Sequence, residues 1–379
     1  MKFSSIIVYG SAIFAMFFGS GNLVFPLQIG LASGDHWFLA FLGLAISGII
    51  LPFLGLFVIK LHNGNYYNFF GQAGILAKHI LPLFILSLLG CFGVVPRCIT
   101  VAHGGFSYLY PNTSLFAFSL VFCALTFIFC LKDQRMISLV GKWLSPALIS
   151  CLVILILLGI YLSPETINKI TPVESFFEGF TTGYQLMDLF AAFFFSSLIF
   201  LQIQKELPHN ISTKRLLRIA ITPSIIGSTM LATVYLGFVY LGAHYSNIIA
   251  NKDPEMMLPI IANHVMGLMA TTFIAFAMVL SCLTTVVALT NIYARYLCNH
   301  IKGARYTWIL ATTIVISFIF SLMDFQGIAK FLVPILEVSY PGIILLTLLD
   351  IIAPKMHSTI KSSVFWGATI IMIGVTAFN

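Results

Sequence analysis

Eleven long apolar runs, separated by short polar loops, follow one another along the 379-residue chain. Each run is long enough to cross about 30 Å of hydrocarbon as a helix that rises about 1.5 Å per residue. A transmembrane β-barrel would instead show alternating polarity. We therefore expect an all-α polytopic membrane protein, with spans at about residues 4–32, 37–60, 78–103, 114–131, 143–163, 175–203, 213–243, 260–298, 306–322, 327–350 and 361–378.

The composition agrees with this class and excludes others. Hydrophobic residues make up 59% of the chain and charged residues only 8%, whereas about 25% of a typical soluble domain is charged. The net charge of +7 comes from basic residues scattered in short loops, without a nucleic-acid-binding motif, so no nucleic-acid partner is expected. Most lysines and arginines fall in loops on one side, which predicts a cytoplasmic N-terminus. No soluble domain fits between the runs, so residues 1–379 form a single transmembrane domain.

The first run is interrupted between Phe17 and Pro26 by the sequence Phe-Phe-Gly-Ser-Gly-Asn-Leu-Val-Phe-Pro. Glycine and proline both disfavour a continuous helix, so we predict a broken span. A break exposes amides at the start of its outer half and carbonyls at the end of its inner half. The amides of Ser20 and Gly21 could hold a carboxylate. The carbonyls of Ala15, Phe17 and Phe18, with the side-chain oxygen of Asn22, could bind a cation; a glycine packing face is the alternative.

The sixth run carries a second interruption from Gly179 to Asp188, which includes Gly183 and Tyr184. Because five spans separate the two breaks, and an odd number reverses direction across the bilayer, the chain is expected to contain two inverted five-helix repeats. The first covers about residues 4–163 and the second about residues 175–350, followed by an extra helix at about 361–378. Such repeats with broken helices are typical of secondary transporters, whose substrates bind near the midplane.

Three charged residues lie inside apolar sequence, where a charge is costly without a partner or water. Asp188 is expected to face the transport pathway, or to bond an exposed backbone group of the break. Arg97 needs an anionic partner, for which Asp188, Glu337 and a substrate carboxylate are candidates. A purely structural pair between Arg97 and Glu337 is a further possibility.

Hydroxyl groups recur on one face of the eighth run, where Ser281, Thr284 and Thr285 stand at i, i+3 and i+4. Oxygen ligands suit a hard monovalent cation, although serine and threonine also bond their own helix backbone. No metal-hydrolase, nucleophile-elbow or phosphate-loop motif occurs, so we expect neither an enzyme nor an ATP-driven pump, and no organic cofactor.

Several of these stretches together resemble the bacterial branched-chain amino acid:cation symporters, the BrnQ-type (LIVCS) carriers. The resemblance rests on Gly19 to Pro26 with Gly30-Leu31 and Gly34-Asp35-His36, and on Pro96-Arg97 with Thr100-Val101. It extends to Gly179-Phe180 with Gly183-Tyr184 and Met187-Asp188, to Cys282 to Thr285, and to Val333-Pro334 with Tyr340-Pro341. It covers nearly the whole chain and implies a LeuT-like five-plus-five fold in which helices 1 and 6 are discontinuous.

The resemblance also implies roles for individual residues. Ser20 and Gly21 would bind the substrate carboxylate, and Gly183, Tyr184, Asp188 and Arg97 would belong to the same region. Asn22 and Phe17 would contribute to one cation site. A second cation site would be formed by Ala15, Phe18, Ser281, Thr284 and Thr285.

The chain departs from the family pattern in three places. The family usually has about twelve spans, and it has an acidic residue where Gly104 stands here and an uncharged residue where Glu337 stands. We therefore hypothesise that Glu337 replaces the missing acid as the partner of Arg97.

The expected function is import of leucine, isoleucine and valine, coupled to Na⁺ or H⁺, across the bacterial inner membrane by alternating access. The oligomeric state is left open. The alternatives are a carrier of the same fold for another small solute and, from a different class, a cation channel. A channel would need filter-like repeats, which the sequence does not contain.

Overall fold

The computed structural model describes residues 3–131, 149–166, 170–206 and 213–378, and within these ranges it contains helices and no strand. The helices before residue 132 are α1 (Phe3–Phe17), α2 (Ser20–Ser33), α3 (Trp37–Ala45), η1 (Ile46–Ile50), α4 (Leu51–Leu61), α5 (Tyr66–Phe70), η2 (Gly71–Ala73), α6 (Ile75–Ser87), η3 (Leu88–Phe92), α7 (Val94–Leu109) and α8 (Leu115–Leu131). A helix at Ile149–Tyr161 follows, and then α10 (Pro172–Gln185), α11 (Asp188–Glu206), α12 (Thr213–His244), α13 (Ser246–Ile249), η4 (Pro254–Met256), α14 (Met257–His300), α15 (Tyr306–Ser321), α16 (Asp324–Ile352) and α17 (Ser358–Phe378).

These helices confirm an all-α membrane protein. In the described part of the chain, six helices are long and apolar enough to span a bilayer, two more spans are bent helix pairs, and three shorter apolar helices remain. The total of eleven spans stays a prediction. The start of the predicted span at 143–163 lies outside the described residues. Residues 132–148, which carry Lys132, Arg135 and Lys142 used to predict the orientation, and residues 207–212 also lie outside them.

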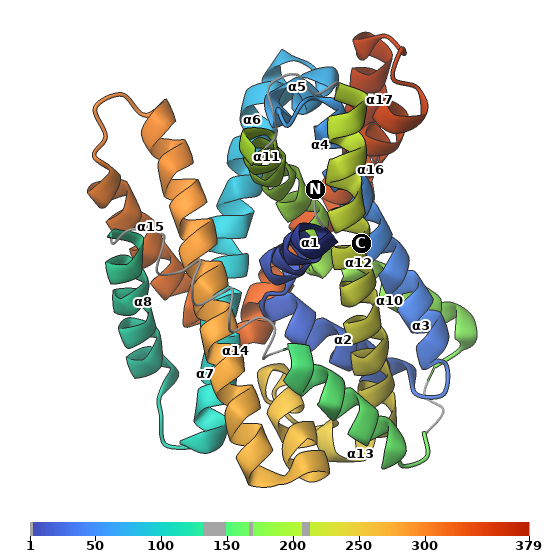
Figure 1. The fold of residues 1–379 in the computed structure, drawn as a ribbon, viewed down its shortest axis with the longest axis vertical. Coiled ribbons are helices and arrows are strands. Elements are labelled where there is room, and N and C mark those ends of the chain that lie inside the picture. Colours follow the sequence, from blue (N-terminus) through green and yellow to red (C-terminus); the bar gives the residue numbers. More distant parts are fainter. Residues whose placement is uncertain (1–2, 132–148, 167–169, 207–212, 379) are drawn as a thin grey trace.

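Helices α5 and α13 lie at opposite ends of the molecule (Figure 1). We call these ends the α5 face and the α13 face. Helix α14 runs between them and bends at Gly267, which has a φ of 78°. Glycine adopts a positive φ at little cost because it has no Cβ. The helix that contains the predicted eighth span is therefore not straight. Helices α8 and α15 pack together on one side of the molecule, and α17 packs against α16.

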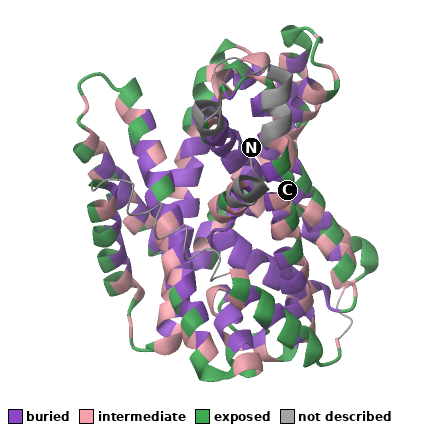
Figure 2. Cartoon of the chain, in the orientation of Figure 1, coloured by how far each residue is buried: buried purple, intermediate pink, exposed green. Residues whose placement is uncertain are grey.

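Exposed residues lie along the sides of the molecule between these faces (Figure 2), and many of them are large and apolar. Phe116 and Leu120 of α8 are 57% and 54% exposed, and Phe273 of α14 is 70% exposed. In water such a surface would be costly, whereas lipid tails solvate it. The burial pattern therefore agrees with a multi-pass membrane protein whose polar residues are turned inward.

Two pairs of glycines bring the repeats into close contact. A Cβ at Gly30 of α2 would collide with the carbonyl oxygen of Val239 on α12, and one at Gly242 would collide with that of Leu27. The second pair is Gly43 of α3 and Gly179 of α10. A Cβ at Gly43 would collide with the carbonyl oxygen of Phe176, and one at Gly179 with that of Ala40. Each broken span thus packs one of its halves against the second span of the other repeat, as an inverted repeat requires.

Replacing Gly30 with alanine is expected to lower stability by about 1 to 3 kcal/mol, because a backbone carbonyl cannot move aside as a flexible side chain can. The measurement is the thermal unfolding midpoint of the purified protein in detergent. Gly374→Ala is the matched control, since nothing lies within 4 Å of its Cβ position. Equal midpoints for the two variants would contradict the close crossing of α2 and α12.

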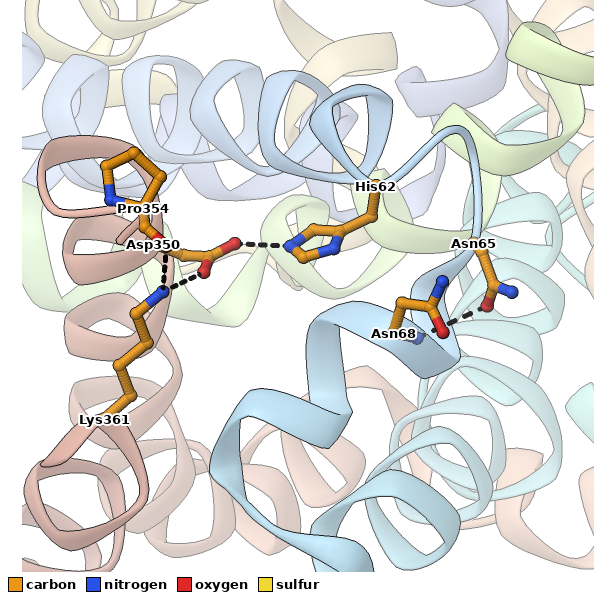
Figure 3. Close-up of polar contacts among 6 residues, drawn as sticks. All are labelled: His62, Asn65, Asn68, Asp350, Pro354 and Lys361. Carbon is orange, nitrogen blue, oxygen red and sulfur yellow. Dashed lines mark hydrogen bonds and ion pairs between the residues drawn. The ribbon is translucent and has the colours of Figure 1, made fainter. Parts of the chain in front are cut away.

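A buried ionic cluster joins α4, α16 and α17 at the α5 face (Figure 3). Asp350 accepts hydrogen bonds from His62 Nε2 and Lys361 Nζ, both at 2.5 Å. Asp350 is 4% exposed and Lys361 is fully buried. Beside the cluster, the side chain of Asn65 caps α5 by accepting the amide of Asn68 at 3.3 Å. Helix α17 is therefore tied to the bundle by buried charge as well as by packing.

Candidate functional site: the centre between two broken helices

The first broken span divides between Phe17 and Ser20, where α1 and α2 meet at 70°. Gly19 is extended there, with φ −114° and ψ −159°. Helix α2 begins at Ser20, so the amides of Ser20 and Gly21 lie in its first turn and have no acceptor within the helix. The predicted break is confirmed, and these two amides lie where a carboxylate could bind.

The second broken span divides at Leu186 and Met187, between α10 and α11, with a bend of 45°. Met187 adopts a φ of 61°, which is uncommon for a residue other than glycine and costs about 1 kcal/mol or more. The prediction that the break begins at Gly179 is wrong, because Gly179 and Gly183 lie inside α10. Both glycines allow close packing instead, and Gly183 contacts Ser47 rather than the centre of the molecule.

Three side chains join the two breaks. Asn22 Nδ2 donates to Asp188 Oδ2 at 2.8 Å and also contacts the hydroxyl of Tyr235, which itself donates to Asp188 Oδ2 at 2.9 Å. Asn22 belongs to α2, Asp188 to α11 and Tyr235 to α12, and all three are buried. This triad places a buried carboxylate between the two breaks and links the first repeat to the second.

The side-chain oxygen of Asn22 accepts the amide of Gly19 at 3.0 Å. The sequence predicted this oxygen as a cation ligand, whereas here it stabilises the start of α2. Asp188 accepts side-chain hydrogen bonds from two neutral donors, Asn22 and Tyr235. It was predicted to face the pathway or to bond an exposed backbone group of the break. The donors found here are side chains, and its place in a pathway stays a prediction.

Replacing Tyr235 with phenylalanine removes one donor from Asp188 while it keeps the shape of the ring. A lost partner of a buried polar group costs about 1 to 3 kcal/mol, so the free energy of unfolding is expected to fall by that amount, measured as a lower thermal unfolding midpoint in detergent. Tyr240→Phe is the matched control on the same helix, because its hydroxyl bonds Ser163 at 2.8 Å, away from the breaks. An unfolding midpoint as high as that of the native protein would contradict the hydrogen bond between Tyr235 and Asp188.

A small cavity lies beside the triad. It is lined by Ser20, Gly21, Asn22, Asp188 and Thr285, and also by Phe17, which adds the inner half of the first break. Its free volume of about 20 Å³ fits about one water molecule. We call it the central cavity. In this conformation it is too small for an amino acid.

The predicted second cation site is only partly assembled. Ser281 Oγ donates to the carbonyl of Phe18 at 3.3 Å, which brings α14 against the end of α1. Thr285 lines the central cavity next to Gly19. The hydroxyl of Thr284 donates to the carbonyl of Ser281 on its own helix at 2.8 Å, and Ala15 is half-buried on α1. Neutral oxygen donors of this kind suit a hard cation.

Arg97 lies on α7 with only 1% of its surface exposed. Its Nη1 donates at 2.7 Å to the carbonyl of Gln185, the last residue of α10. Its guanidinium carbon lies 5.4 Å from the ring centre of Phe25. Its Nε has no hydrogen-bond partner within the described part of the chain. A buried cation with an unused donor is suited to receive an anion.

The hypothesised partner of Arg97 lies elsewhere. Glu337 is exposed on α16, and no ion pair with the fully buried Arg97 is formed. The structure therefore does not support the hypothesis that Glu337 compensates for the acid missing at Gly104. Instead, Glu255 of η4 packs against Gly104, where a Cβ would lie 2.5 Å from its Cγ. Tyr184, also predicted for the site, stacks on Tyr340 with ring centres 4.5 Å apart and does not line the central cavity.

Two broken helices that meet around buried polar groups are the arrangement found in transporters of the LeuT type. Solved transporters share this fold. Mhp1, a nucleobase-cation-symport-1 family transporter, in a closed conformation with bromovinylhydantoin bound, aligns with a TM-score of 0.67 at 14% identity, over 98% of this chain and 92% of its own. MhsT in complex with L-phenylalanine aligns with a TM-score of 0.56 at 13% identity, over 98% of both chains.

The chain belongs to the family described as branched-chain amino acid transport protein, whose profile matches residues 2–378. Relatives include the branched-chain amino acid permease BrnQ of Haemophilus influenzae, 29% identical over 93% of this chain and 83% of its own. Another is the permease BraB of Bacillus subtilis, 26% identical over 91% of this chain and 79% of its own. The expected family is thereby confirmed. It is a family of transport proteins, in agreement with the prediction that the chain is not an enzyme.

Proposed function

We propose that this protein imports leucine, isoleucine and valine together with Na⁺ or H⁺ by alternating access. The observation that carries the proposal is the triad of Asn22, Asp188 and Tyr235, which joins both broken helices beside a central cavity. The relatives named as branched-chain amino acid permeases favour this substrate class. We further propose a bacterial cytoplasmic membrane with the N-terminus and the α5 face inside, since Lys60, Lys78 and Lys361 lie near that face.

The substrate carboxylate would bind the amides of Ser20 and Gly21 in the first turn of α2. The unused Nε donor of Arg97, a residue that does not line the central cavity in this conformation, would be a further partner. The aliphatic side chain would contact the apolar part of the cavity lining, such as Leu89, Val94 and Phe195. Such a pocket binds branched side chains by burying them, at about 25 cal/mol per Å². It offers no second acid for a cationic side chain beyond Asp188.

A coupled cation would supply the driving force. One cation that crosses 100 mV supplies about 2.3 kcal/mol, which corresponds to roughly 50-fold accumulation. Two places could carry this charge. Na⁺ would bind the carbonyl of Phe18 with the hydroxyls of Ser281 and Thr285, whereas H⁺ would be carried by the buried carboxylate of Asp188.

The test is uptake of labelled leucine, isoleucine and valine into proteoliposomes, with sodium and proton gradients imposed separately. We expect one of the two gradients to drive concentrative uptake of all three amino acids. Absence of gradient-dependent uptake of any of them would contradict the proposal. Uptake of an unrelated solute under the same gradients would favour the alternative, a carrier of this fold for another substrate.

Replacing Thr285 with alanine is expected to weaken the cation dependence about tenfold, and to leave the preference among the three amino acids unchanged. The reason is that Thr285 lines the central cavity beside the first break, where its methyl group lies next to Gly19. The measurement is the cation concentration that gives half-maximal leucine uptake. Thr272→Ala is the control on the same helix, since its hydroxyl donates to the carbonyl of Leu268. An unchanged cation response would remove Thr285 from the site.

A further inference from the structure

Two cysteines of the described structure lie against each other on neighbouring helices. The side chains of Cys98 on α7 and Cys282 on α14 share a hydrogen bond, and both residues are fully buried. Neither forms a disulfide. We call them the thiol pair. The transport steps proposed above use neither thiol.

Close packing of α7 against α14 holds the thiol pair together. A Cβ at Gly105 of α7 would lie 3.3 Å from the carbonyl oxygen of Ala275 on α14, so the two backbones are close there. Cys98 precedes Gly105 by seven residues, and Cys282 follows Ala275 by seven. Seven residues make about two turns of a helix and return to the same face. The two helices are therefore antiparallel, and the thiols face each other within one packed interface.

The thiol pair also borders the central cavity. Cys98 Sγ donates to Ser20 Oγ at 3.4 Å, and Ser20 lines the cavity. Ser20 belongs to the first turn of α2, whose amides could bind a carboxylate. Arg97, the residue before Cys98, is a buried cation. A solute in the central cavity would therefore touch the residue to which Cys98 is bonded.

Two facing thiols provide two soft ligands for a metal ion. The thiolate is the form of cysteine that binds metals, and a neighbouring arginine favours it. Sulfur ligands select soft cations such as Cu⁺. Within the described residues, no three side chains of His, Cys, Asp or Glu come together as a metal site, whereas structural zinc takes four ligands. The pair therefore fits a soft monovalent cation, which two sulfur ligands can hold.

We propose that Cys98 and Cys282 together bind one soft monovalent cation, Cu⁺ or Ag⁺, and that the bound ion blocks transport. Each thiol releases one proton when its sulfur binds the metal, so the complex carries one net negative charge, which the guanidinium of Arg97 balances. The thiol hydrogen that Cys98 donates to Ser20 is lost. A negative charge beside the amides of Ser20 and Gly21 then disfavours the substrate carboxylate. Only this blocking effect rests on the proposed function; binding of the ion does not.

The test is binding of Ag⁺ to the purified, reduced full-length protein in lipid nanodiscs, in nitrate buffer without chloride or added thiol. The free Ag⁺ concentration is kept just high enough to saturate the native protein, and bound silver is counted per protein molecule. The native protein is expected to bind one ion more than Cys98→Ser and one ion more than Cys282→Ser. The double variant should lose no further ion, because the two thiols share one.

Two results of this count would overturn the site. If the double variant binds two ions fewer than the native protein and each single variant one fewer, the thiols bind silver separately. If all four proteins bind the same number of ions, the thiols bind none. The unfolding midpoint of each variant shows that it is folded, and Cys282→Ala replaces Cys282→Ser if serine is not tolerated in the buried interface.

Inhibition of leucine uptake in proteoliposomes tests the blocking effect. Cys98→Ser and Cys282→Ser should need at least about tenfold more Ag⁺ than the native protein for half-maximal inhibition. The matched control is Cys123→Ser with Cys130→Ser, which removes two buried cysteines of α8 and should stay as sensitive as the native protein. Equal sensitivity of all these proteins would overturn the blocking effect. If the native protein takes up no leucine, the proposed function fails, while the silver count still decides the site.

Discussion

Uptake of branched-chain amino acids is expected to fall at least about 30-fold when Arg97 is replaced by glutamine. The residue is a fully buried cation whose Nε donor is unused in the described structure. Loss of one partner from a buried charge pair costs about 2 to 5 kcal/mol, and about 1.4 kcal/mol corresponds to tenfold in kcat/KM. The measurement is initial uptake of leucine in proteoliposomes over a range of leucine concentrations.

A second role of Arg97 has to be separated from this one. Its Nη1 also caps the carboxyl end of α10 through the carbonyl of Gln185, and lost caps cost about 0.5 to 2 kcal/mol of stability. Arg97→Lys keeps a charge at the helix end but loses the planar fork that binds a carboxylate. We expect Arg97→Lys to be near native in unfolding midpoint and still defective in uptake. Near-native uptake by Arg97→Lys would contradict a carboxylate-binding role. The control is Arg295→Gln, which removes an exposed arginine of α14 and should leave leucine uptake unchanged.

The largest effect on stability is expected from Asp350→Asn. This change removes the charge that neutralises Lys361, which is fully buried, and it weakens the bond to His62. A buried charge left without its partner costs about 3 to 5 kcal/mol. The measurement is the thermal unfolding midpoint in detergent, together with the yield of folded protein in the membrane.

Two further variants show whether unpaired charge is the cause. Glu337→Gln removes an exposed carboxylate from the same helix and should leave the midpoint unchanged. Replacing both residues, Asp350→Asn with Lys361→Met, removes the buried cation as well and should recover most of the loss. If the double variant is as unstable as Asp350→Asn alone, the cluster does not act through its charge.

Much of the fold could be predicted from the sequence because the bilayer imposes a length on each span. The run lengths indicated a helical membrane protein, and Gly19 located the first break to within one residue. The second break was placed too early. Gly179 and Gly183 look like helix breakers, yet they serve the close contact of α10 with its neighbours, while the break depends on a positive φ at Met187. A methionine in that conformation is imposed by tertiary packing and has no local sequence signal.

The candidate site was predictable where polarity stood out from apolar surroundings. Ser20, Asn22 and Asp188 do meet at the centre. Tyr235 was missed, because α12 is largely apolar and its periodicity does not indicate which residues face α11. A buried tyrosine needs a partner for its hydroxyl, and that rule was the only signal available. The pairing of Arg97 with Glu337 failed for the same reason, since the rotation of α16 about its axis cannot be read from its sequence.

The paired glycine crossings have a consequence for biosynthesis. Helix α2 is made long before α12, the helix against which Gly30 packs, and α3 is made long before α10, which Gly43 contacts. Each half of the protein therefore leaves the ribosome with an interhelical surface that only the other half can cover. The N-terminal half enters the membrane as an unfinished structure and has to be kept from aggregation until residues 172–244 have been inserted.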